Sequence, residues 1–176
     1  MSFSSLIQWG AVGFMLGGVA WVASGLMVVF ANPIMGPAPA YPVVVMVALL
    51  LTVVGLVGLH VFQRESYGRI GRVGFYTALV GITLQILGTG APLLGGSDLI
   101  WPWLRFPVGF VVVLVGFVLL GVATLLARAL PRWYGVVLII LQPVSVILLA
   151  YGNVWRGLVL VVLGYELWLR RNGSAE

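Results

Sequence analysis

The chain has 176 residues, of which 62% are hydrophobic and only 7% charged, and its formal net charge is +5. An average soluble domain is about 45–50% apolar and about 25% charged, so this composition excludes a water-soluble globule and a disordered chain. The chain has no cysteine, which excludes disulfides, thiolate metal sites and iron–sulfur clusters. All nine basic residues are arginine, which excludes cofactors bound through a lysine Schiff base.

Six apolar runs are long enough to predict membrane-spanning helices, each of which needs about 20 largely apolar residues. In chain order the runs cover residues 6–31, 41–62, 73–93, 106–126, 134–151 and 154–169. Only Gly152 and Asn153 separate the last two runs, and we expect a tight turn there. The predicted fold class is an all-α polytopic transmembrane helix bundle that forms a single integral membrane domain over residues 1–176.

The arginines predict how the chain is oriented in the membrane. One set of connections holds seven of them: Arg64, Arg69, Arg72, Arg128, Arg132, Arg170 and Arg171. The opposite set holds only Arg105 and Arg156. By the positive-inside rule, both termini are expected in the cytoplasm and the protein in the inner (cytoplasmic) membrane of the cell. Most Trp and Tyr residues fall near the two predicted membrane interfaces, and Trp21 is the only Trp well inside a run.

Many of the 24 glycines recur every seven residues, a period that keeps one helix face against a neighbour in a left-handed bundle. The first run carries two such series, Gly10, Gly17, Ser24 and Gly18, Gly25. Later runs carry the series Gly74, Gly81, Gly88 and Gly109, Gly116, Ala123. We expect these series to pack helices of one chain together; the alternative is a seam between two copies.

The connection over residues 88–107 is long and largely apolar. It contains Asp98, Trp101, Trp103 and Arg105. Connections longer than about 12–15 residues are often functional. We therefore expect a ligand or partner site in this connection together with Trp155 and Arg156; the alternative is an apolar cap at the membrane interface.

Polar residues inside the runs are the second group of candidates: His60, Gln85, Gln142 and Glu166. Glu166 and Arg170 have the spacing of a helix ion pair. His60 is expected to be a packing residue that bonds a backbone carbonyl or Glu166; the alternatives are a proton relay or a ligand to a pigment metal. Gln85 and Gln142 are expected to bond across helices, and the alternative is a polar pathway.

No arrangement of residues predicts an enzyme, a cofactor or a metal site, and no basic soluble element predicts nucleic-acid binding. The leading hypothesis is a non-enzymatic scaffold or accessory subunit that packs against a membrane partner or a second copy, or that binds lipid or another apolar molecule. The alternative hypothesis is a small carrier or channel for a neutral or apolar solute, because there are few charges within the runs to compensate a charged one.

Three short patterns carry a resemblance to a known group of proteins. They are Gly58-Leu59-His60 with Gly68-Arg69-Ile70-Gly71, the segment Ala127-Arg128-Ala129-Leu130-Pro131-Arg132-Trp133, and the segment Leu163-Gly164-Tyr165-Glu166-Leu167-Trp168. The chain resembles small bacterial integral membrane proteins of uncharacterised function, loosely and over its second to sixth runs. This resemblance implies about six helices and no known activity.

Overall fold

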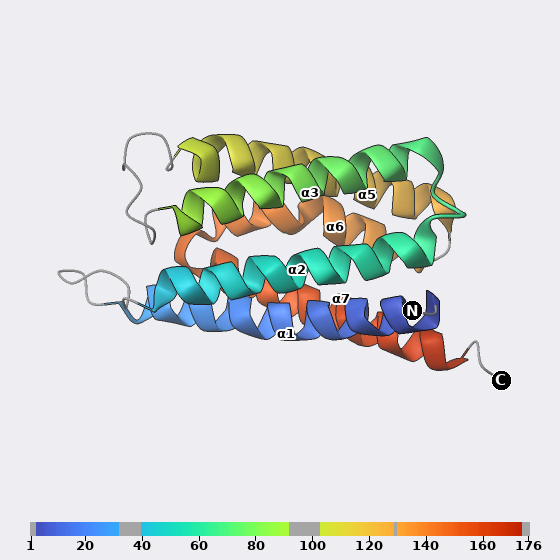
Figure 1. Cartoon of the computed structure of the whole chain (residues 1–176), viewed down its shortest axis with the longest axis horizontal. Helices are drawn as coiled ribbons and strands as arrows, with labels where there is room; N and C mark the ends of the chain where they lie inside the picture. Colours follow the sequence, from blue (N-terminus) through green and yellow to red (C-terminus); the bar gives the residue numbers. More distant parts are fainter. Residues whose placement is uncertain (1–2, 32–39, 92–102, 129, 174–176) are drawn as a thin grey trace. The chain divides into compact units, whose positions relative to one another are not determined.

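The computed structural model describes residues 3–31, 40–91, 103–128 and 130–173. The structure is 92% helix, without strands in the described part, which confirms the all-α fold class (Figure 1). In chain order the elements are α1 (Phe3–Val29), α2 (Tyr41–Gln63), α3 (Gly68–Gly90), η2 (Leu104–Gly109), α5 (Phe110–Ala127), α6 (Arg132–Ile147), η3 (Leu149–Tyr151) and α7 (Gly152–Gly173).

Four stretches are helical, long and apolar enough to cross a membrane: Ser5–Val29, Tyr41–Gln63, Gly68–Gly90 and Phe106–Ala127. They make this an integral membrane protein. Helix α6 has 16 residues, a length of about 24 Å at 1.5 Å per residue, whereas the hydrocarbon core is about 30 Å thick. Helix α7 is longer, with 22 residues, but it contains Arg156, Glu166 and Arg170.

The third helix begins earlier than the sequence predicts. Helix α3 starts at Gly68, not at residue 73, so that Arg69 and Arg72 lie in its first turns and only Arg64–Tyr67 connect it to α2. Both arginines are exposed. Their long side chains reach water from a helix, so the charges do not end the helix. Gly68 itself has a φ of +63°, which a residue without Cβ adopts readily.

The turn between the last two helices also differs from the prediction. It lies at residues 148–151, where Leu149 has a φ of +49°, and α7 already begins at Gly152. Gly152 has ordinary helical angles, with φ −59° and ψ −36°. A Cβ at this position would collide with the carbonyl oxygen of Ser145. Gly152 is therefore required for the close approach of the chain and not for the turn.

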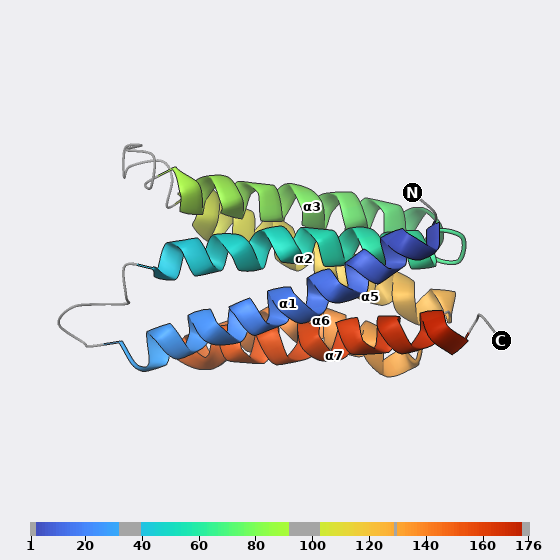
Figure 2. The ribbon, with the colours of Figure 1, turned by 60° about the horizontal axis from the view of Figure 1, so that its bottom comes forward.

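The chain divides into two compact units: unit 1 is Met1–Glu65 with Val144–Glu176, and unit 2 is Ser66–Pro143. In unit 1, α1 packs against both α2 and α7, and Figure 2 shows α1 lying between them. In unit 2, α3 packs against α5 and η2. A Cβ at Gly121 of α5 would lie 2.6 Å from the carbonyl oxygen of Gly135, so α5 also contacts α6.

The two glycine series of α1 face two different helices. Gly10 meets Gly58 of α2 backbone to backbone. A Cβ at Gly18 would lie 2.5 Å from the carbonyl oxygen of Gly157 in α7, and one at Gly25 would lie 2.7 Å from the amide nitrogen of Val154. Small residues permit this close contact inside a membrane, where hydrophobicity cannot drive helices together. The predicted packing within one chain is confirmed for these series.

Unit 2 has one glycine seam of the same kind between α3 and α5. A Cβ at Gly74 would lie 2.7 Å from the amide nitrogen of Leu120, and one at Gly81 would lie 2.5 Å from that of Val113. From the other side, Gly116 meets the backbone of Ala78. These pairings run in opposite directions along the two helices, so α3 and α5 are antiparallel.

Candidate functional site

Polar side chains from α1 and α2 meet inside unit 1 at Trp21. Its indole Nε1–H donates to the hydroxyl of Thr52, with a distance of 3.1 Å between nitrogen and oxygen. The Thr52 hydroxyl in turn donates to the carbonyl of Ala48 at 2.7 Å, and Ser24 donates to the carbonyl of Trp21 at 2.8 Å. Trp21 and Thr52 are both only 4% exposed. This chain of bonds fixes the indole between two helices.

Arg156 of α7 brings a positive charge to the same place. Its guanidinium carbon lies 4.4 Å from the centre of the Trp21 ring, a distance typical of a cation–π contact. Arg156 is the fifth residue of α7, about 6 Å along the axis from its first. Trp21 lies eight residues, or about 12 Å, before the end of α1. The charge is therefore held within the helices of unit 1 and not in a connection beyond them.

The preceding residue adds an indole to this site. Trp155 is half-buried, and its Nε1–H is buried without a hydrogen-bond partner among the described residues. A buried N–H without a partner is costly, which favours an added acceptor at this position. Arg156 offers hydrogen-bond donors and one positive charge, which suits a phosphate, carboxylate or carbonyl oxygen. Trp155 is the adjacent residue of α7, and neighbouring residues on a helix do not face each other.

The residues of the first predicted site, in the connection over residues 88–107 and at Trp155 and Arg156, do not all belong to one unit. Trp155 and Arg156 belong to unit 1, whereas Trp103 and Arg105 belong to unit 2. Trp103 is 64% exposed, and the backbone of Arg105 lies in η2. Asp98 and Trp101 lie outside the described residues. Within unit 1, Arg156 meets Trp21, a residue that the sequence did not place at the site.

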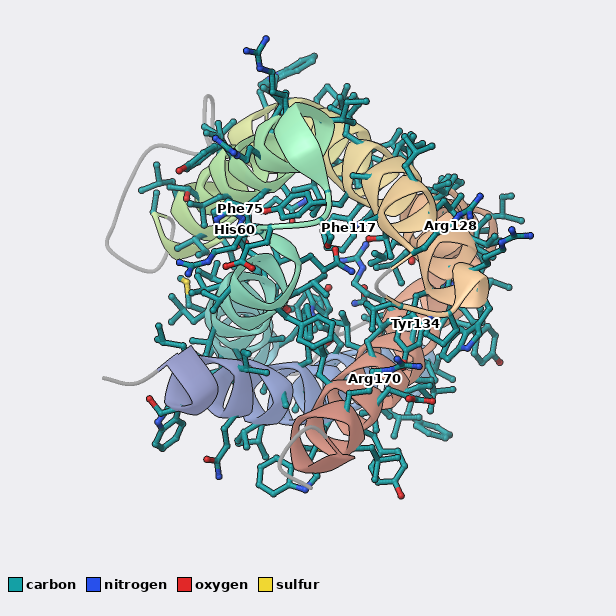
Figure 3. The ribbon with its side chains drawn as sticks, turned by 90° about the vertical axis from the view of Figure 1, so that its right-hand side faces the viewer. His60, Phe75, Phe117, Arg128, Tyr134 and Arg170 are labelled. Carbon is teal, nitrogen blue, oxygen red and sulfur yellow. The ribbon has the colours of Figure 1, made fainter. Side chains whose placement is uncertain are left out.

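Two of the predicted intramembrane residues lie in unit 1, toward its opposite end. Glu166 forms the predicted ion pair with Arg170, with 3.8 Å between Oε2 and Nε. His60 is half-buried near the end of α2; Figure 3 shows His60 and Arg170 at the same end of this unit. The expected contact between His60 and Glu166 stays a prediction.

The two glutamines lie in unit 2, and both are buried, with exposures of 7% for Gln85 and 3% for Gln142. Gln85 continues the packed face of α3 that includes Gly81 and Gly88, as predicted. The expected hydrogen bond between the two amides stays a prediction. One turn beyond Gln85, the Thr89 hydroxyl is buried without a hydrogen-bond partner among those residues.

Two residues that hold Arg156 in place, Trp21 and Thr52, were not predicted from the sequence. Trp21 gave a signal, because it is the only Trp well inside a predicted helix and outside the interface belts. Thr52 gave none, because a hydroxyl in a membrane helix commonly bonds the carbonyl one turn before it. Both residues depend on the register between α1 and α2, which spacing within one helix does not fix.

Comparison of the chain with models of protein families, with curated proteins and with solved structures finds no match.

Proposed function

We propose that the protein is a non-enzymatic membrane scaffold or accessory subunit. In this role it packs against a membrane partner, or binds a lipid or another apolar molecule. The observation that carries the proposal is the contact of Arg156 with Trp21 inside unit 1. Ionisable residues within membrane helices are rare and costly, so they are functional candidates by default.

The surroundings of Arg156 favour a static contact site over a moving part. Its ring partner, Trp21, is bonded to Thr52 of α2, so three helices are joined at this point. Glycine contacts hold α1 against α7 on both sides of it, at Gly18 and Gly25. A fixed cation at Arg156 is suited to hold the phosphate of a lipid or a backbone carbonyl of a partner helix.

The proposed location is a bacterial inner membrane with six crossings and both termini in the cytoplasm. The distribution of arginines supports this orientation, because seven lie on one side of the predicted topology and two on the other. In this arrangement the Arg156 site lies near the outer surface of the membrane.

The test is purification in a mild detergent followed by mass spectrometry of the lipids and proteins that remain bound. We expect the wild type to retain a lipid or a membrane subunit, and Arg156→Gln to lose most of it. The matched control is Arg64→Gln, which removes an exposed arginine of unit 1 that pairs with Glu65. Nothing retained by the wild type, or equal retention by the two variants, would contradict the proposal.

A small carrier for a neutral solute is the second candidate, and the buried polar groups of unit 2 favour it. Gln85 and Thr89 lie one turn apart on the face of α3 that is packed inside unit 2. Flux of neutral solutes into liposomes should then fall in Gln85→Leu and Gln142→Leu. Flux that both substitutions abolish would replace the scaffold proposal with the carrier.

A further inference from the structure

Four exposed arginines gather at one end of unit 2. They are Arg69, Arg72, Arg128 and Arg132. None of the four forms an ion pair within the described residues. The only acid between residues 66 and 143 is Asp98, which lies outside the described part, in the chain that follows the opposite end of α3. The nearest acid along the chain is Glu65, four residues before Arg69, and its carboxylate lies 3.7 Å from Arg64. This end of unit 2 therefore carries an excess of positive charge.

The helix packing places these arginines at similar levels. Because α3 and α5 are antiparallel, with Gly74 beside Leu120, the start of α3 lies at the end of α5. Gly121 beside Gly135 likewise brings the start of α6 to the end of α5. Arg69 and Arg72 are three residues apart, which makes them neighbours on the surface of α3. Figure 3 shows Arg128 and Tyr134 at this end, on α5 and α6.

Arg128 has a backbone conformation that disfavours an arginine. It ends α5 with a φ of +52° and a ψ of 13°, in the left-handed region. Glycine is the usual residue at such a helix end, because a Cβ is unfavourable in this conformation. A side chain kept against this preference is consistent with a function for its charge.

Aromatic rings flank the arginines. The rings of Trp133 and Tyr134 lie 3.9 Å apart between centres and are tilted by 33°, and Trp133 is 40% exposed. Tyr76 of α3 is 58% exposed and meets Phe75 edge to face. Trp and Tyr rings with one apolar and one polar edge favour the level of lipid headgroups. The arginines therefore lie where a headgroup is available, which favours a lipid over a soluble anion.

We propose that this end of unit 2 binds the headgroup of an anionic lipid that carries two phosphates. One phosphate is satisfied by one or two guanidinium groups through paired hydrogen bonds. Four arginines on three helices match a headgroup with more than one negative charge. This inference goes beyond the proposed function and uses none of the residues of unit 1.

The test measures binding of a bis-phosphatidyl lipid to the purified full-length protein in nanodiscs of zwitterionic lipid, by native mass spectrometry. We expect the wild type to prefer this lipid over a lipid with one phosphate of the same chain length. Each arginine removed should weaken binding about fivefold, so Arg69→Gln combined with Arg72→Gln should weaken it about 25-fold. Arg64→Gln, in unit 1, is the matched control and should leave binding unchanged.

Arg128→Gly separates binding from folding. Glycine suits the left-handed backbone at residue 128, so the thermal stability of this variant should stay the same or rise while lipid binding falls about fivefold. Arg128→Lys should keep most of the binding. Unchanged binding in Arg128→Gly, equal affinity for lipids with one and two phosphates, or displacement of the lipid by an equal concentration of inorganic pyrophosphate would each overturn the proposal.

Discussion

The helices of both units pack through glycine contacts, but the two units place charged residues differently. In unit 1, glycines bring α1 against α2 and α7, and a cation, Arg156, is held inside the helices on Trp21. In unit 2, glycines bring α3 against α5, and the buried polar groups are neutral, with Gln85 and Gln142 among them. Close packing through glycine is thus independent of the chemistry that each unit presents.

The arginine-carrying ends of the two units also differ, in whether their arginines form ion pairs. At the end of unit 1 that contains His60, Arg64 lies 3.7 Å from Glu65 and Arg170 lies 3.8 Å from Glu166. The arginine-rich end of unit 2 has no such pair within the described residues. Two of the four acids of the chain therefore offset arginines of unit 1, and the charge of unit 2 remains available to anions.

The largest expected effect comes from substitutions in the glycine contacts between helices, which both units share. Gly58→Val in unit 1 and Gly116→Val in unit 2 each push a side chain into the backbone of the facing helix, at Gly10 and Ala78. Each should lower the free energy of unfolding by about 3 kcal/mol, because backbone cannot move aside as a flexible side chain does. Denaturation in detergent would measure the loss.

The control for this comparison is Gly68→Ala. A Cβ there meets nothing within 4 Å, and only the φ of +63° opposes it. The expected cost is about 1–2 kcal/mol. Equal losses at Gly58 and Gly68 would show that the helices separate without much strain, and that glycine contacts do not set the packing.

A smaller effect should distinguish the buried hydrogen bond between two helices of unit 1 from an exposed hydrogen bond within one helix of unit 2. Trp21→Phe keeps a ring under Arg156 but removes the hydrogen bond to Thr52, and the expected loss of stability is about 1 kcal/mol. Thr83→Val is the matched change in unit 2. Its hydroxyl donates to the carbonyl of Leu79 in its own helix, so little stability should be lost. Denaturation of both variants under one condition compares them, and equal losses would contradict a bond that joins helices at Trp21.

Removing the acids of unit 1 should make its charged end resemble that of unit 2. Glu65→Gln combined with Glu166→Gln leaves Arg64 and Arg170 without their carboxylates. Binding of a bis-phosphatidyl lipid should increase about fivefold. Stability should change little, because the Arg64–Glu65 pair is exposed and the Arg170–Glu166 pair is partly exposed, and such pairs contribute little. Native mass spectrometry would count the additional bound lipid. No increase would mean that the number of unpaired arginines is not what attracts the lipid.

The sequence predicted the helices and the two glycine series of α1, because both depend on spacing along one chain. The prediction from the sequence was wrong at the start of α3 and at the turn before α7, where the local preferences of single residues did not decide the structure. Arg69 and Arg72 were predicted to lie in a connection, yet they lie on the surface of α3. Gly152 was predicted to be a turn residue, yet glycine is required at this position because the carbonyl of Ser145 leaves no room for a side chain. The Arg156–Trp21 contact requires the register between α1 and α7, which no single segment encodes.

The smallest effect concerns Tyr67, which is buried beside the start of α3 in unit 2. Burial raises the pKa of Tyr67 from 10.0 to about 12, although the charge of Arg72 acts in the opposite direction. The folded protein holds this proton up to about pH 12, whereas the unfolded chain releases it near pH 10. Between these values the unfolded state binds fewer protons, so stability falls as the pH rises through the window and is unaffected below it.

The difference in ultraviolet absorbance of tyrosinate between the wild type and Tyr67→Phe would measure this titration, with denatured protein as the reference. Tyr67→Phe should also remove the corresponding part of the alkaline loss of stability. Ionisation of Tyr67 near pH 10 in the folded protein would mean that this ring is open to water. The connection between α2 and α3 would then not be packed as the structure shows. The start of α3, which carries Arg69 and Arg72, would not be held in a fixed position for binding the lipid.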